Sequence, residues 1–137
     1  MARQETVIRL LQIEDSLEDA ESIVNALRNG GIAVRSLRPE NEEELVEQLA
    51  KQGSDVVVAA YPGRQIKFEA VAQAVRRSSR PLALVASAAR LDEELLLAAN
   101  ALGAFHVVLR SKPEQVLANL RHAYGAVEAR RSQQRLE

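Results

Sequence analysis

The sequence contains no cysteine, and its apolar runs are short. Because it can form neither a disulfide nor a thiolate metal site, we expect a protein of a reducing compartment, the cytoplasm. The longest apolar stretches fall far short of the about 18 residues that a membrane-spanning helix needs. We also expect no signal peptide, because residues 1–5 are polar and the apolar segment after them is short and interrupted. The sequence therefore predicts no membrane partner.

Neither sign of charge dominates the chain. It has 18 basic and 19 acidic residues in intermixed order, with a net charge of -1. This balance argues against nucleic acid or an anionic membrane as the main partner. The chain also lacks an internal repeat and a glycine-rich phosphate-binding pattern; residues 61–64 are read as a turn. Its 137 residues are enough for one domain around a single core.

Five short aliphatic runs predict five β-strands, of which at least the third and fourth are continuous enough to be buried on both faces. The runs cover residues 7–13, 32–37, 55–60, 81–86 and 106–109.

Helical periodicity between these runs predicts five helices. The first ends at the glycines of residues 29–31, and the second begins at its cap, Asn41, and buries Leu45, Val46 and Leu49. A stripe over residues 68–75 predicts the third helix, and the fourth covers residues 91–102. The fifth begins at Pro113 and extends to about residue 127.

Strands that alternate with helices through short connections favour right-handed crossovers and a parallel sheet covered on both faces. The predicted fold is α/β: a doubly wound five-stranded parallel sheet in the order 2-1-3-4-5 with five helices, as in flavodoxin and CheY. We assign residues 1–127 to this domain. The polar residues 128–137 are predicted to be a helical extension or a linker to a further domain.

In such sheets ligands bind at the carboxyl ends of the strands, where this chain reads Ile-Glu-Asp-Ser over residues 13–16. The chain to about residue 127 resembles response-regulator receiver domains. In that family an acidic pair, here Glu14 and Asp15, helps to hold a magnesium ion beside a phosphoacceptor aspartate that ends the third strand. The resemblance places Ala60 in the phosphoacceptor position. Alanine has no carboxylate, so the resemblance implies a degenerate receiver.

Two further positions depart from the receiver pattern. The residue that bonds the phosphoryl group, usually threonine or serine, corresponds to Ala86, and the neighbouring Ser87 would point to the opposite face of the sheet. The lysine of the family corresponds to Arg110. A lysine followed by a proline, as in the family motif, occurs two residues later, at Lys112 and Pro113. This pair is either a shifted copy of the motif or the start of the last helix.

The acidic pair also has a purely structural interpretation. Asp15 or Ser16 can cap the first helix, and two carboxylates without a third ligand make a weak magnesium site. The two histidines, His106 and His122, are expected to lie far apart as ordinary surface or structural residues. The sequence thus predicts no resident metal, no cofactor and no catalytic residue.

The fourth predicted helix is apolar nearly all the way round. If its core side is made of residues 96, 99 and 102, its outward side is a candidate interface, and the receiver resemblance implies dimerisation at this region. The alternative is a solvated helix. The partner would be a second copy, as a homodimer, or another domain of the parent protein. The candidate interface residues are Leu95, Leu97, Ala98 and Ala101.

Three segments, VIRLLQIEDS, LRNGG and DVVVAA, look like the N-terminal receiver-like domain of FimX-type proteins. That family joins a degenerate receiver to PAS, GGDEF and EAL domains, senses cyclic di-GMP and acts in type IV pilus assembly. The resemblance implies a non-catalytic regulatory or docking domain. Two alternatives stay open: a receiver that still binds magnesium or is modified elsewhere, and a small-ligand-binding flavodoxin-like domain.

Overall fold

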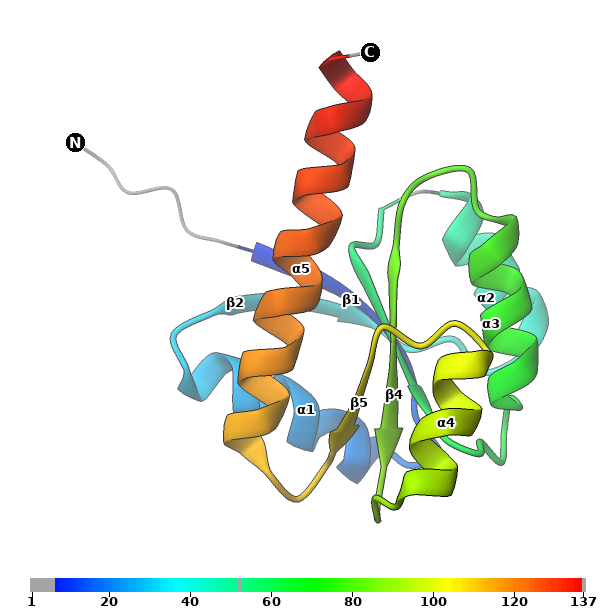
Figure 1. Ribbon diagram of the computed structural model, residues 1–137, viewed down its shortest axis with the longest axis vertical. Coiled ribbons are helices and arrows are strands. Elements are labelled where there is room, and N and C mark those ends of the chain that lie inside the picture. Colours follow the sequence, from blue (N-terminus) through cyan, green and yellow to red (C-terminus); the bar gives the residue numbers. More distant parts are fainter. Residues whose placement is uncertain (1–6, 52, 137) are drawn as a thin grey trace.

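The computed structural model describes residues 7–51 and 53–136 as a parallel sheet between two layers of helices (Figure 1). The expected absence of a signal peptide concerns residues 1–6, which lie outside this part. The strands are β1 (Val7–Ile13), β2 (Ala33–Leu37), β3 (Val56–Ala60), β4 (Ala83–Ala88) and β5 (His106–Leu109). The helices are α1 (Leu17–Asn29), α2 (Glu42–Ala50), α3 (Phe68–Arg77), α4 (Glu93–Ala101) and α5 (Pro113–Leu136).

The strand order is β2-β1-β3-β4-β5, and every neighbouring pair is parallel. The predicted fold class is therefore confirmed. β4 differs from the prediction: it begins at Ala83 and continues to Ala88, two residues past the predicted end.

Alternating side chains of the sheet supply two separate cores. Val56 and Val58 of β3 pack toward α1 and α5, whereas Val57 and Ala59 pack toward α2, α3 and α4. Figure 1 shows this division, with α1 and α5 on one face of the sheet and the other three helices on the opposite face. Among the α2 residues expected in the core, Val46 is the exception, because 58% of its surface is exposed.

Local capping explains where several helices begin and end. The side chains of Ser16, Asn41 and Asp92 each accept a hydrogen bond from the backbone N–H three residues later, which satisfies an otherwise unpaired donor. After α1, Gly31 has a φ of 85°, in the left-handed region that a glycine adopts without strain. The caps at Ser16 and Asn41 and the glycine stop after α1 agree with the sequence prediction, whereas α4 begins at Glu93, two residues after its predicted start.

The long helix α5 is attached to the amino-terminal edge of the sheet by Arg131. Its guanidinium lies 2.6 Å from Asp55 Oδ1 and donates to the carbonyl oxygens of Ser54 and Pro81. Arg131 and Asp55 are both 5% exposed. The packed part of α5 therefore reaches beyond the boundary that we placed at residue 127.

No helix in the described part of the chain is both long enough and apolar enough to cross a membrane.

Candidate functional site: a charged cluster at the carboxyl ends of the strands

The register of the three central strands brings the predicted site residues to one edge of the sheet. Ile13 pairs with Ala59, and Ala60 pairs with Ser87 on β4. Glu14 directly follows β1, so it lies at the same edge. Ala60 and Ser87 are buried, with 3% and 0% of their surface exposed. The position at the end of β3 is thus enclosed, and it presents a methyl group.

The structure differs from the sequence prediction at β4. Ser87, not Ala86, is the residue beside Ala60. Ala86 points to the opposite face and packs in the core under α2, α3 and α4. The prediction ended the fourth strand at Ala86, but β4 continues to Ala88, and its register against β3 pairs Ala60 with Ser87. The site therefore contains a hydroxyl group that we had expected on the other face of the sheet.

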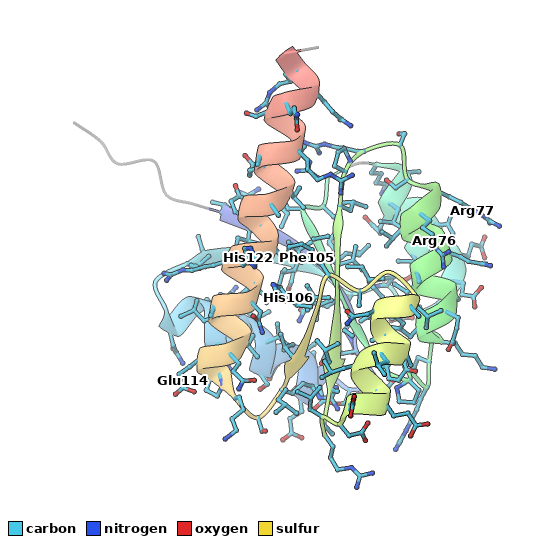
Figure 2. All side chains as sticks on the ribbon, in the orientation of Figure 1. Arg76, Arg77, Phe105, His106, Glu114 and His122 are labelled. Atoms are coloured by element: carbon cyan, nitrogen blue, oxygen red, sulfur yellow. The ribbon has the colours of Figure 1, made fainter. Side chains whose placement is uncertain are left out.

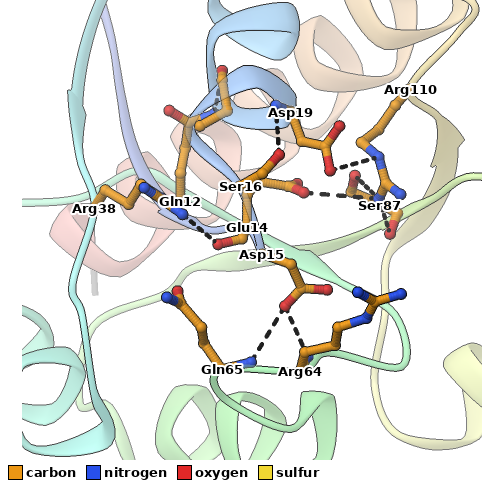
Figure 3. A network of polar contacts seen from close by, with 11 residues as sticks. Gln12, Glu14, Asp15, Ser16, Asp19, Arg38, Arg64, Gln65, Ser87 and Arg110 are labelled. Carbon is orange, nitrogen blue, oxygen red and sulfur yellow. Dashed lines mark hydrogen bonds and ion pairs between the residues drawn. The ribbon is translucent and has the colours of Figure 1, made fainter.

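Arg110, which follows β5, reaches into this cluster (Figure 3). Its Nη1 atom lies 3.0 Å from both the carbonyl oxygen and the Oγ of Ser87. The same atom is 3.7 Å from Glu14 Oε2, and Nε is 3.6 Å from Asp19 Oδ2. By contrast, Lys112 is exposed and lies just before α5, so Pro113 is explained as the helix start. Arg110 is thus the cation that pairs with the Glu14 and Asp19 carboxylates, whereas Arg38 donates to the backbone oxygen of Glu14.

Glu14 is buried at the centre of the cluster, with 1% of its surface exposed. Neither carboxylate oxygen has a hydrogen-bond partner. Burial is the main reason that the pKa of this carboxyl is raised from 4.5 to about 7, and the carboxylates of Asp19 and Asp15 contribute in the same direction. The Ser87 hydroxyl and the Arg110 guanidinium lower this pKa, but by less than burial raises it. The hydroxyl approaches Glu14 without forming a well-aligned hydrogen bond. Glu14 therefore exchanges its proton close to neutral pH.

Asp15 has a separate role. Its Oδ1 atom accepts hydrogen bonds from the backbone N–H groups of Arg64 and Gln65, at 2.7 and 3.3 Å, and so fixes the loop after β3 (Figure 3). Ser16, rather than Asp15, caps α1. The two members of the acidic pair thus face different neighbours: Glu14 forms an ion pair with Arg110, and Asp15 binds the backbone of the loop after β3.

These donors do not fit a magnesium ion. One Asp15 oxygen is occupied by backbone N–H groups, Glu14 faces a guanidinium, and the third carboxylate of the receiver pattern is replaced by Ala60. Within residues 7–51 and 53–136, no group of three or more His, Cys, Asp or Glu residues is placed to hold a metal ion. The sequence indicated Asp19 only as an acidic residue of the first helical turn, because its part in the site depends on where Arg110 lies.

A groove of about 440 Å³ lies elsewhere, between α2 and α3. Leu45, Leu49 and Ala74 are part of its apolar lining, with Glu42 and Arg77 among its polar residues. None of the residues of the charged cluster lines this groove.

The candidate interface on α4 is only partly exposed. Leu97 is 63% exposed and Ala101 is also exposed, but Leu95 and Ala98 are half-buried. Ala99 is the only fully buried residue of this helix. The outward side of α4 is thus narrower than predicted, and Leu97 is its most prominent apolar side chain.

The expectation that the two histidines lie far apart is wrong. His106 Nε2 and His122 Nδ1 are 2.9 Å apart, because α5 packs beside β5.

Comparisons with solved structures show the receiver fold. The signal receiver domain of NarL from Mycobacterium tuberculosis superposes with a TM-score of 0.72 at 20% identity, covering 89% of this chain and 98% of that one. The chemotaxis response regulator CheY4 of Vibrio cholerae gives 0.70 at 19% identity, over 86% and 99%. A response regulator from Thermotoga maritima gives 0.71 at 16% identity, over 87% and 98%. No family model and no curated protein matches the sequence. At these identities the likeness establishes the CheY-like fold.

Proposed function

We propose that this chain is a pseudo-receiver: a non-catalytic signalling domain with the receiver fold that regulates or docks without accepting a phosphoryl group. One observation carries the proposal. Ala60 ends β3 at the enclosed edge of the sheet, beside Ser87, and the guanidinium of Arg110 is bonded to that same serine. The cluster resembles a receiver site from which the nucleophile is missing.

Phosphoryl transfer to a receiver needs an oxygen nucleophile in line with the phosphorus and a metal ion that neutralises the developing charge. Ala60 offers no oxygen, and Glu14 lies in a buried position beside Arg110. Ser87 has a hydroxyl group, but that hydroxyl already accepts a hydrogen bond from Arg110, and the side chain is fully buried. The site therefore supports a structural and regulatory role.

Acetyl phosphate with Mg²⁺ tests this proposal. We expect no increase in intact mass by one phosphate, whereas a receiver domain with an aspartate at this position, treated in parallel, gains one. Phosphate on Asp15, Asp19 or any other aspartate of the chain would contradict the proposal and support the alternative of a receiver modified at another residue. Calorimetric binding of Mg²⁺ that Glu14→Gln abolishes would support the alternative of a receiver that retains its metal.

We also propose that the domain acts through contacts of the α4 face, with a second copy or with another domain of its parent protein. Leu97 is the most exposed large apolar residue in the described part of the chain, and Phe105, just before β5, is 41% exposed. Contacts of this kind stabilise an assembly only if several apolar side chains are buried together.

For the biological setting, the three FimX-like segments support a cytoplasmic parent protein of cyclic di-GMP and type IV pilus signalling. If the parent gene is sequenced, we expect it to encode PAS, GGDEF and EAL domains downstream of this domain. Adjoining domains of another kind would remove this setting and leave the pseudo-receiver proposal intact. The flavodoxin-like alternative rests on the groove between α2 and α3, and saturable binding of a small ligand there would favour it.

A further inference from the structure

The only two histidines of the chain form a pair on the surface between β5 and α5. They are 16 residues apart in sequence, yet His106 Nε2 and His122 Nδ1 are separated by 2.9 Å. Figure 2 shows the two imidazoles and the ring of Phe105 gathered at this place. Neither histidine belongs to the charged cluster around Glu14.

Phe105 holds the two imidazoles in place. Its ring centroid lies 4.6 Å from that of His106 and 5.3 Å from that of His122. The backbone N–H of Phe105 is in turn bonded to the carbonyl oxygen of Leu84, which fixes the start of β5 against β4. The orientation of the pair thus depends on ring packing as well as on the single hydrogen bond between the rings. Ligands that are held before the metal arrives bind it more tightly.

The distance between the two nitrogens suits one particular class of metal ion. Two nitrogens that are each about 2.0 Å from one metal ion, at a right angle, are about 2.8 Å apart. Right angles between neighbouring ligands are typical of tetragonal Cu²⁺ and Ni²⁺, for which imidazole is a preferred ligand. The observed 2.9 Å is therefore close to the separation that such an ion needs.

A metal ion binds the neutral form of imidazole. Burial lowers the pKa of His106, as does the neighbouring His122, and this favours the neutral form of the His106 ring. In the metal-free pair one of the two facing nitrogens carries the shared proton. On binding, that proton moves to the other nitrogen of its ring, so that both facing nitrogens offer a lone pair to the metal ion.

We propose that His106 and His122 form a two-histidine site for one divalent transition-metal ion of the Cu²⁺ or Ni²⁺ class. His106 binds through Nε2 and His122 through Nδ1. Within the described residues no third His, Cys, Asp or Glu gathers with them into a ligand group, so water completes the coordination. The site is open to the solvent on the β5–α5 side of the molecule.

The test is a titration of the whole 137-residue chain with Cu²⁺ and, separately, with Ni²⁺, in a buffer that does not chelate metals. Electron paramagnetic resonance of the Cu²⁺ form should show a tetragonal ion with two nitrogen ligands. Ni²⁺ should broaden the NMR signals of both imidazoles before any others. We expect one ion per chain.

Variants separate the pair from other metal-binding groups. His106→Asn and His122→Asn should each weaken binding by about tenfold or more, because either change removes the chelate. The double variant measures binding by the remaining groups of the chain, and matching circular dichroism spectra confirm the fold. Equal binding by the parent and the double variant would overturn the proposal, as would a Cu²⁺ spectrum without nitrogen ligands or imidazole signals that Ni²⁺ leaves unchanged.

Discussion

Replacing Glu14 with glutamine should make the domain more stable at high pH, because the parent protein there buries an ionised carboxylate. In the folded chain the pKa of Glu14 is about 7, against an ordinary value of 4.5. The main cause of this raised pKa is burial, which the Ser87 hydroxyl and the Arg110 ion pair at 3.7 Å offset only in part. Glu14→Gln keeps the size of the side chain and removes the charge.

The sign and the size of the effect follow from this raised pKa. The folded protein holds the Glu14 proton more tightly than the unfolded chain does. The contribution of the neutral carboxyl to the unfolding free energy is therefore fully present below about pH 4.5. It is lost as the pH rises through about 7. Since one pKa unit corresponds to about 1.4 kcal/mol, the loss is on the order of 3 kcal/mol. The glutamine variant is not subject to this loss.

The assay is urea-induced unfolding of the parent and of Glu14→Gln at several values between pH 4.5 and pH 8.5. The difference in unfolding free energy between the two proteins should shift in favour of the variant by on the order of 3 kcal/mol across this range. Glu21→Gln, an exposed site on α1, is the matched control and should show little change. If the variant instead loses stability relative to the parent as the pH rises, Glu14 is ionised and Arg110 compensates its burial, and the reasoning is refuted.

Three further predictions concern other parts of the chain. Leu97→Arg should abolish any self-association that light scattering detects in the parent. Val46→Arg, at a residue of similar exposure on α2, should leave self-association unchanged. Equal effects of the two substitutions would exclude α4 as the interface. Arg131→Leu should lower the unfolding free energy by about 3 kcal/mol or more, because Asp55 stays buried without its cation, and adding Asp55→Asn should recover part of that loss. Ala60→Asp should not restore a phosphorylation-dependent change in NMR chemical shifts, since Arg110 keeps its bonds to Ser87; a robust change would show that the missing carboxylate was the only defect.

Much of the architecture is determined by local patterns that the sequence displays. Strands buried on both faces must be aliphatic throughout, as in β3, and helices that cover a sheet must repeat their apolar residues at helical spacing, as in α3. Ser16 and Asn41 cap their helices through contacts only three residues away. Patterns of this range are readable without a structure, and so is the alanine at position 60, because it directly ends an aliphatic run.

The site itself depends on contacts between residues far apart in sequence, which only the tertiary structure decided. The register of β4 against β3 places Ser87 beside Ala60, and a shift of one residue exchanges the two faces of a strand. The burial that raises the pKa of Glu14 comes from the surrounding strands and helices and from no property of its neighbours in sequence. Likewise, His106 and His122 meet because α5 packs beside β5, and such packing is set by the whole core.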